Sequence, residues 1–479
     1  MILRVINHPY EFDIKNLCIT FFPHEKIRLE GEEDPVVVTT RQETDGSFFV
    51  SAKVYDVYRE TTAKPEPADE EHLVLSVTLY RLLSGILGFA PPWGVLYGVR
   101  PAKLMHRLCA QMGDDAAVAH FQTAFLTQKS KAELAHEVML HENRSIARSG
   151  PKSFSLYVSI PFCPTRCAYC SFVSHSIEKT HKLMTPYVDL LLRELEETAK
   201  YAKELGLELA TVYFGGGTPT TLSAQDLGRI FSTIEQNFDL SHLMEYTVEA
   251  GRPDTVTRER LEVIQAAGVQ RISINPQSFN DKVLEAIGRR HTAQQTLDAF
   301  ALARNCGFDH INMDFIAGLP EDDLPSFQRS VQTALDLQAE SITVHTLALK
   351  TSAYMVTREQ TFDLKDRLTV SNMVDYAGQT LHGAGYYPYY MYRQSKSLGN
   401  LENVGWCKPG YDCLYNVYMM DETHTVLAVG AGAVTKLRGQ NSGMIERIYN
   451  YKYPYEYIRD FDTLLERKKR IPGFYAEYD

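Results

Sequence analysis

The stretch FSLYVSIPFCPTRCAYC, residues 154–170, joins an apolar segment typical of a buried strand to a loop with three cysteines. Cys163, Cys167 and Cys170 are spaced four and then three residues apart, and thiolates at this spacing on a loop can ligate three corners of a cubane iron–sulfur cluster. A single zinc ion would normally take a fourth Cys or His, and His175 is near enough in the sequence to be considered. A zinc knuckle and a set of buried thiols are the alternatives to a cluster.

Strand-like and helix-like segments alternate from this point onward. The predicted strands are Phe154–Ile160, Leu209–Phe214, Glu245–Glu249, Val269–Ile274, His310–Phe315 and Ser341–His345. Amphipathic helices lie between them, for example near Pro186–Leu205, where apolar residues recur at helical spacing. About six βα units predict an α/β fold with a parallel sheet, open or curled into a partial barrel. Ligands of such sheets gather at the carboxyl ends of the strands.

The flanking regions have a different pattern. Strand-like segments are expected at Tyr10–Phe22, Val36–Thr39 and Phe48–Tyr58, with a hairpin turn at Asp45-Gly46. Helices are expected from residue 72 to about 148, and a helix to Ala384 and a charged helix near Tyr455–Arg470 are expected further on. The predicted domains are an N-terminal α+β domain over residues 1–150, a core over 151–365 and a small C-terminal α+β portion over 366–479.

Composition narrows the possible partners. The 479 residues carry 49 Lys and Arg against 60 Asp and Glu, a net charge of −11, which does not favour a protein that coats nucleic acid. The N-terminus lacks the apolar core of a signal peptide, and the most apolar stretch, Leu73–Leu96, is interrupted by Arg81 and by Pro91-Pro92. We therefore expect a cytoplasmic protein without a membrane or nucleic-acid partner, whose clustered thiols act as ligands rather than as disulfides.

A glycine-rich turn follows the second predicted strand. The sequence there is Gly215-Gly216-Gly217-Thr218-Pro219. Glycines let a backbone approach a ligand closely, and we expect exposed N–H groups in this turn to act as donors.

These two strand ends resemble the radical S-adenosylmethionine (SAM) superfamily, in which three cysteines bind a [4Fe-4S] cluster. The open iron of that cluster is chelated by SAM, and reduction of the cluster cleaves SAM to a 5′-deoxyadenosyl radical. Further segments over residues 153–440 are similar to the oxygen-independent coproporphyrinogen III oxidase (dehydrogenase) family, most of all to its HemZ-type branch. These segments are Glu245–Glu249, Arg271–Phe279, Gly288–Thr292, Asn312–Pro320, Tyr390–Gln394, Gly399–Gly405 and Lys408–Tyr411.

The resemblance implies a partial (β/α)6 TIM-like radical SAM barrel and a set of site residues. Cys163, Cys167 and Cys170 would ligate the cluster. Tyr157 would contact SAM. The residues that would hold the methionine end of SAM are Gly216, Gly217 and Thr218, and the other SAM contacts would be Glu249, Gln277, Arg289 and Asp314. Their chemistry agrees with this, because a strand-end carboxylate can accept from ribose hydroxyls and a guanidinium can pair with a carboxylate.

The implied function is an oxidoreductase of anaerobic haem biosynthesis. Its substrate would be a tetrapyrrole, coproporphyrinogen III, whose propionates are oxidatively decarboxylated to the vinyl groups of protoporphyrinogen IX. An electron donor would reduce the cluster and an electron acceptor would take up the product electron. We expect a monomer. The resemblance assigns no catalytic side chain.

Two departures from the family pattern leave other functions open. Ser171-Phe172 stands where decarboxylating members have a further cysteine, and Phe172 resembles the haem-chaperone branch. Ser159 stands where those members have a histidine. The alternatives are a haem-binding chaperone on the same scaffold and a radical SAM haem ring-opening methyltransferase.

The remaining candidates have weaker support. Candidate basic partners for substrate carboxylates are Arg393, Lys396, Lys350 and Arg358, but we expect these four to be ordinary surface charges. Tyr386–Tyr392 could line a pocket for a flat macrocycle or belong to the core. Cys407 and Cys413 could bind a metal with Cys306 or His424, but we expect buried free thiols, and we expect Cys18 and Cys109 to be isolated and packed.

Overall fold

A parallel sheet forms the centre of the computed structural model, which describes residues 1–23, 25–31, 34–98, 100–170, 175–348, 364–394 and 397–479. All six predicted core strands are confirmed, as β5 (Ser153–Ile160), β8 (Glu208–Gly216), β9 (Glu245–Glu249), β10 (Arg271–Ser273), β11 (His310–Ala317) and β12 (Ser341–Thr346). Each pairs in parallel with the next in the order β12-β11-β10-β9-β8-β5. The (β/α)6 arrangement of the sequence analysis is therefore confirmed.

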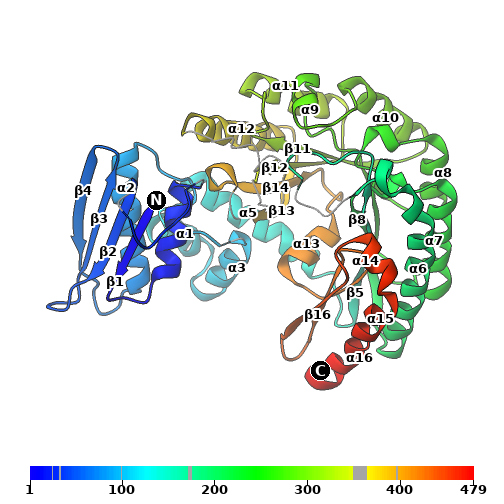
Figure 1. Ribbon diagram of the computed structural model, residues 1–479, viewed down its shortest axis with the longest axis horizontal. Coiled ribbons are helices and arrows are strands. Elements are labelled where there is room, and N and C mark those ends of the chain that lie inside the picture. Colours follow the sequence, from blue (N-terminus) through cyan, green and yellow to red (C-terminus); the bar gives the residue numbers. More distant parts are fainter. Residues whose placement is uncertain (24, 32–33, 99, 171–174, 349–363, 395–396) are drawn as a thin grey trace.

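Helices connect these strands and cover the outer face of the sheet (Figure 1). They are α6 (Ile177–Glu204), α7 (Ala224–Asn237), α8 (Arg258–Ala266), α9 (Asp281–Ala286), α10 (Ala293–Asn305) and α11 (Leu324–Asp336). Buried apolar residues recur along each at helical spacing, as Leu227, Ile230, Phe231 and Ile234 do in α7. Helix α6 begins nine residues before Pro186, so this proline lies inside the helix and not at its start.

The C-terminal part extends the same sheet at both ends. At one end β14 (Glu402–Cys407) pairs antiparallel with β12, and β13 (Tyr387–Arg393) pairs with β14. At the other end β15 (Thr425–Val429) adds a seventh parallel strand beside β5, followed by β16 (Val434–Arg438) and β17 (Ile445–Tyr449). Helix α12 (Leu364–Gly383) agrees with the prediction, whereas the final charged segment forms three short helices, α14 (Pro454–Arg459), α15 (Phe461–Lys468) and α16 (Arg470–Tyr478), instead of one.

The N-terminal part has its own four-stranded sheet at the left of Figure 1. Its strands are β1 (Ile2–Ile6), β2 (Val36–Arg41), β3 (Phe48–Val54) and β4 (Val57–Ala63), and its helices are α1 (Glu11–Phe21), α2 (Glu71–Leu87), α3 (Pro101–Met112), α4 (Asp114–Thr123) and α5 (Lys129–Ile146). The strand predicted over Tyr10–Phe22 is wrong, because this segment is helix α1. Its buried residues Ile14, Leu17, Cys18 and Phe21 follow the helical period, which outweighs their β propensity. The predicted domain limits stay a prediction.

A tight turn and a buried ion pair join the N-terminal helices to the barrel. Gly94 has φ 58°, and a side chain there would meet the carbonyl oxygen of Phe125, so the turn requires glycine. The turn buries Trp93, whose Nε1 donates to Glu402 Oε2 of β14 at 2.7 Å. Lys131 of α5 donates to the same carboxylate at 2.6 Å. Trp93 therefore has a structural role, because it connects this turn to β14.

A second buried ion pair fixes the C-terminal helices on the sheet. Glu194 of α6 and Lys468 of α15 are both 0% exposed, and Lys468 Nζ lies 2.8 Å from Glu194 Oε1. The other carboxylate oxygen, Oε2, accepts from Tyr457 Oη at 2.6 Å and from the Gly430 N–H at 2.8 Å. Gly430 directly follows β15, so this network ties the seventh parallel strand to α6.

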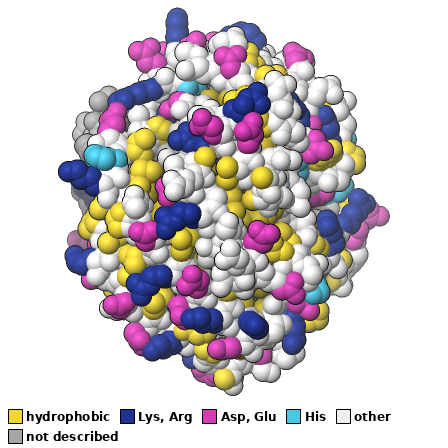
Figure 2. All heavy atoms as spheres, turned by 90° about the vertical axis from the view of Figure 1, so that its right-hand side faces the viewer, with side chains coloured by type: hydrophobic (Ala, Val, Ile, Leu, Met, Phe, Trp, Pro, Cys, Tyr) yellow, Lys and Arg dark blue, Asp and Glu magenta, His cyan; other side chains and the backbone are white. Residues whose placement is uncertain are grey.

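Positive and negative side chains are mixed on the surface formed by the outer helices. Figure 2, which looks at the right-hand side of Figure 1, shows basic and acidic side chains interspersed there. Among the residues that the structure describes, no helix combines the length and the apolar character needed to cross a membrane.

The Glu194–Lys468 pair gives a prediction about stability. Lys468→Met leaves the Glu194 carboxylate buried without its counter-charge, and breaking a buried pair in this way costs about 3 to 5 kcal/mol. We expect a loss of this size in the free energy of unfolding, measured by urea denaturation followed by circular dichroism. The control is Lys469→Met, whose exposed pair with Glu466 is screened by solvent, so its loss should change the free energy of unfolding little. Equal stability of the two variants would contradict the role given to the buried pair.

Candidate cofactor-binding cavity

A cavity of about 620 Å³ lies at the carboxyl ends of the parallel strands. It is lined by every residue that the sequence analysis placed in the site: Tyr157, Cys163, Cys167, Cys170, Gly216, Gly217, Thr218, Glu249, Gln277, Arg289 and Asp314. Their shared location follows from the parallel sheet, whose strand ends meet at one edge. The part that each plays in binding stays a prediction.

The three cysteines lie on the loop that follows β5. Cys163 belongs to the short strand β6 (Phe162–Cys163), which pairs with β7 (His175–Ser176). The N–H of Cys170 donates to the carbonyl of Cys167, and Cys167 is the most buried of the three. The loop is also fastened to the turn after α9, because the Ala168 N–H donates to the Ile287 carbonyl at 3.0 Å. The loop is thus shaped by backbone hydrogen bonds while its thiols line the cavity.

The loop fits a polynuclear cluster better than a single zinc ion. A tetrahedral zinc needs its ligand atoms a few ångströms apart, yet the one place where the described residues bring three metal-type ligand atoms within 4.8 Å of one another is elsewhere. His175, the fourth ligand that a zinc ion would need, does not line the cavity. Its ring instead packs edge-on against Tyr453 and Tyr455.

The glycine turn after β8 holds the cysteine loop. Contrary to our expectation, the N–H groups of Gly217 and Thr218 are not open donors, because they donate to the carbonyls of Ile160 at 2.7 Å and Phe162 at 2.8 Å. A side chain at Gly217 would overlap the Phe162 carbonyl, so glycine is required for this close approach. Thr218 Oγ1 also lies 3.5 Å from Cys163 Sγ. Two of the N–H groups that we expected to bind a ligand therefore form hydrogen bonds within the protein.

Three tyrosine rings and a carboxylate form one wall of the cavity. Tyr157 of β5, Tyr213 of β8 and Tyr415 of helix α13 (Leu414–Asp421) stack, with centroid separations of 4.4 to 6.2 Å. Tyr213 Oη donates to Glu249 Oε1 at 2.6 Å. Burial raises the pKa of Glu249 to about 7, although the hydrogen bond from Tyr213 opposes the rise. Glu249 therefore changes charge near neutral pH.

The pKa of Asp314, another carboxyl group of the cavity, is shifted in the opposite direction. Burial alone would raise its pKa, but the neighbouring His345, the hydrogen bond from Asn312 and the charge of Arg271 together outweigh burial, and the pKa lies below its ordinary value. Asn312 Nδ2 donates to Asp314 Oδ1 at 2.7 Å, and His345 Nε2 lies 3.9 Å from Oδ2. The site thus combines a carboxylate that stays ionised with one that titrates, which is how two acidic residues in one cavity take different roles.

Two buried polar atoms that belong to cavity residues form no hydrogen bond with the described residues. Arg289 Nη1 donates to the Asn275 carbonyl at 2.6 Å and Nη2 to Tyr169 Oη at 3.3 Å. Its Nε and the Asn275 Oδ1 have no hydrogen-bond partner among the described residues, and both residues line the cavity. Gln277, also at the cavity, holds a positive φ of 67°, a conformation that costs free energy outside glycine and clusters at functional sites. These features are those of a site built for a polar ligand.

Several cavity residues were missed in the sequence analysis. Arg252 lies three residues after Glu249, the last residue of β9, and could have been found from its place just beyond a strand end. Arg271, at the start of β10, was quoted as part of a motif without a role, and its Nε and Nη1 have no partner among the described residues. Asn416, Met419 and Met420 come from α13, and no local signal in the sequence places this helix in the barrel.

The structure also corrects the weaker candidates. Arg393 is not a surface charge, because it is buried over the Trp93 ring and donates to the carbonyls of Leu96 and Asn400. Lys350, Arg358, Lys396, Ser171 and Phe172 lie outside the described residues. Tyr390 and Tyr392 line the cavity, as the pocket interpretation of Tyr386–Tyr392 required, whereas Tyr389 is fully buried.

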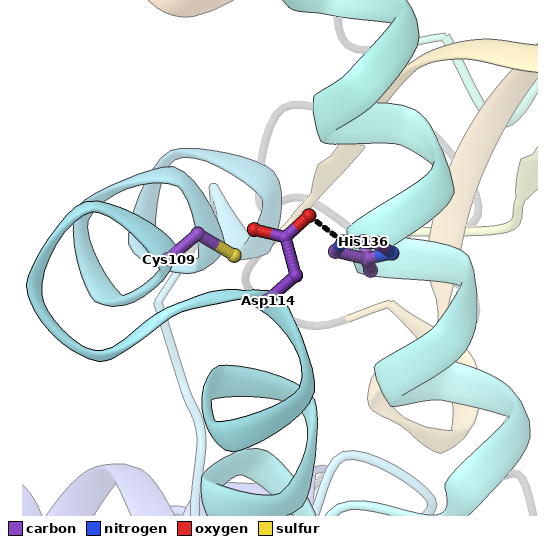
Figure 3. Close-up of side chains that lie close together, drawn as sticks. All are labelled: Cys109, Asp114 and His136. Carbon is purple, nitrogen blue, oxygen red and sulfur yellow. Dashed lines mark hydrogen bonds and ion pairs between the residues drawn. The ribbon is translucent and has the colours of Figure 1, made fainter.

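The other thiols lie outside the cavity. Cys407 and Cys413 are buried and free, as expected, and Cys413 Sγ lies 3.3 Å from Glu245 Oε1. Cys109 is not isolated, because it lies beside Asp114 and His136 (Figure 3). His136 Nε2 lies 3.0 Å from Asp114 Oδ2, and the thiol hydrogen-bonds to the same carboxylate. These hydrogen bonds on a partly exposed surface account for the grouping.

Comparison with known proteins agrees with this geometry. The radical SAM superfamily profile matches residues 157–334. The chain is 34% identical to the oxygen-independent coproporphyrinogen-III oxidase-like protein HemZ of Bacillus subtilis, over 95% of this chain and 94% of that protein. It is 30% identical to the haem chaperone HemW of Haemophilus influenzae, over 66% of this chain and 78% of that one. The solved structure of coproporphyrinogen III oxidase (HemN) from Escherichia coli matches with a TM-score of 0.50 and 21% identity, over 68% of this chain and 72% of that one.

Glu249 gives a prediction about pH. An unfolded glutamate has a pKa of about 4.3, so between that value and about 7 the folded chain binds a proton that the unfolded chain does not. The contribution of Glu249 to stability is therefore present at low pH and is lost as the pH rises toward about 7. We compare the free energy of unfolding of the unaltered apoprotein with that of Glu249→Gln at about pH 5.5 and at about pH 8. The unaltered protein should lose on the order of 2 kcal/mol more than the variant between these two pH values.

Urea unfolding of both proteins at the two pH values measures this double difference. Glu235→Gln, which removes an exposed carboxylate of α7, is the control and should show no such difference. A double difference of zero for Glu249→Gln would show that its carboxyl does not titrate near neutral pH.

Proposed function

Since this chain belongs to the radical SAM superfamily, in the family of the HemZ-like relatives of oxygen-independent coproporphyrinogen III oxidase, we propose that it oxidatively decarboxylates the propionates of coproporphyrinogen III. The products would be vinyl groups, as in protoporphyrinogen IX, and the setting would be anaerobic haem biosynthesis. One observation carries the proposal: a single cavity contains the three thiols, the polar strand-end residues and a wall of tyrosines and methionines.

The superfamily uses a [4Fe-4S] cluster and SAM as cofactors. Together, when the cluster is reduced, they supply an organic radical able to remove a hydrogen atom from an unactivated carbon. We propose Cys163, Cys167 and Cys170 as the cluster ligands, since they line the cavity and no further cysteine of the described residues does.

The polar residues of the cavity would orient SAM. The unpartnered Arg289 Nε and Asn275 Oδ1 lie beside the cysteine loop and suit the carboxylate and the amino group of a methionine moiety. Glu249, with its pKa near neutral, can accept from an ammonium group, and the ionised Asp314 can accept from ribose hydroxyls.

The rest of the lining suits a flat, largely apolar substrate with acidic side chains. Tyr390, Tyr392, Met419 and Met420 present aromatic and thioether surface to the cavity. Arg271 is 1% exposed, lines the cavity and has two guanidinium nitrogens without partners, and we propose that it receives a substrate carboxylate. The charge of Arg271 also acts on the nearby Glu245, whose carboxylate accepts from the N–H groups of Leu414 and Tyr415 at the start of α13.

A haem-binding chaperone is the second candidate. The similarity to HemW favours it, because two proteins with this name are each 30% identical to this chain, over 66% and 64% of its length. HemZ matches 95% of this chain, whereas these haem chaperones match 66% and 64% of it. We therefore place the decarboxylase first.

The test is an anaerobic assay of the chain reconstituted with iron and sulfide. Incubation with SAM, a reductant and coproporphyrinogen III should give vinyl-bearing product together with 5′-deoxyadenosine. Tight haem binding without turnover would support the chaperone instead, and a methylated, opened linear tetrapyrrole would support a ring-opening methyltransferase.

Cys167→Ala tests the cluster ligands. Loss of one of three thiolates should remove most of the bound iron and sulfide and the visible absorbance of the cluster, because only two of the proposed ligands remain. Cys306→Ala, at a half-buried thiol outside the cavity, is the matched control and should load normally. A Cys167→Ala protein that keeps a full cluster would overturn this assignment.

A further inference from the structure

Arg252 is a buried guanidinium beside the cysteine loop. It follows β9, lines the cavity and is 3% exposed. Asp254 holds it at two points, with Nε donating to Oδ1 at 3.0 Å and Nη2 to Oδ2 at 2.9 Å. Such a fork fixes the plane of a guanidinium, so the remaining nitrogen, Nη1, points in a defined direction.

That nitrogen faces the cysteine loop. Arg252 Nη1 donates to Thr165 Oγ1 at 3.2 Å and lies 3.4 Å from the Thr165 carbonyl oxygen. It also donates to Cys167 Sγ at 3.8 Å, a distance within the range of hydrogen bonds to sulfur. The fork with Asp254 therefore aims an N–H group at the sulfur atom of a proposed cluster ligand.

Other charged groups among the described residues lie near this contact. Arg289 is a second cation at this loop, because its positive charge acts on Tyr169 and Cys167 and its side chain hydrogen-bonds to both. His291 is buried nearby, and burial, followed by the charges of Arg289 and Arg252, lowers its pKa to about 3, so it is neutral. Asp254 balances the charge of Arg252. What Cys167 receives from Arg252 is therefore mainly a directed N–H donor.

We propose that Arg252, by donating from Nη1 to Cys167 Sγ, raises the reduction potential of the cluster and so makes its one-electron reduction easier. The inference rests on the proposed function, in which Cys167 is a cluster ligand. Hydrogen bonds to the sulfurs of a cluster stabilise its reduced, more negative state, and groups that act on ligands in this way tune the metal without touching it. Arg252 is thus a positioning residue that acts through Cys167.

The test compares midpoint potentials of Arg252→Gln and the unaltered chain, both reconstituted anaerobically. Iron and sulfide are counted first. Dithionite then supplies one electron per cluster in a titration followed by electron paramagnetic resonance. The Arg252→Gln cluster should have a more negative midpoint potential. The matched control is Arg260→Gln, whose guanidinium donates to the backbone carbonyls of Leu222 and Thr255, and its midpoint potential should not change.

Arg252→Lys is the second variant. It keeps a positive charge but cannot be held in a two-point fork, so its midpoint potential should also lie below that of the unaltered chain. A fully loaded Arg252→Gln or Arg252→Lys cluster at the unaltered potential would overturn the inference. Failure of both variants to load would show that Arg252 serves loop assembly and not the potential, and would overturn it too. An unaltered chain that takes up no cluster would instead refute the proposed function.

Discussion

Two backbone hydrogen bonds fix the cysteine loop to the glycine turn beside the cavity. The N–H groups of Gly217 and Thr218 donate to the carbonyls of Ile160 and Phe162, which fastens the glycine turn after β8 to the start of the cysteine loop after β5. The contact is so close that a side chain at position 217 would overlap the Phe162 carbonyl. The place of Cys163 relative to the strand ends, and with it the place of any ligand between the loop and the sheet, depends on this contact.

The sheet itself was predictable because its signals are local. Six apolar segments separated by amphipathic helices gave the parallel core, and the polar residues at their ends, such as Glu249 and Asp314, meet in the cavity as this topology requires. The first helix was not recognised, because β-branched and aromatic residues in Tyr10–Phe22 suggested a strand although Ile14, Leu17, Cys18 and Phe21 share one helical face. Periodicity is the stronger signal where it conflicts with propensity.

The rest of the site depends on contacts between distant parts of the chain, which a linear sequence does not display. Helix α13 packs against β13 and β8 and brings Tyr415 onto the rings of Tyr157 and Tyr213. The sequence likewise does not show that the amides of the glycine turn are already occupied, or that the fork between Arg252 and Asp254 aims a donor at Cys167. The acidic net charge belongs to the chain as a whole, whereas two buried arginines, Arg252 and Arg289, interact with the cysteine loop.

The central claim is that the three thiols and the strand-end polar residues form one binding site for a cluster and SAM. The most direct measurement is the electron paramagnetic resonance spectrum of the dithionite-reduced protein before and after addition of SAM. A shared site predicts the signal of a reduced [4Fe-4S] cluster whose g values change when SAM binds, because SAM takes the iron that lacks a protein ligand. An unchanged spectrum at saturating SAM, or a protein with no reducible cluster, would contradict the claim.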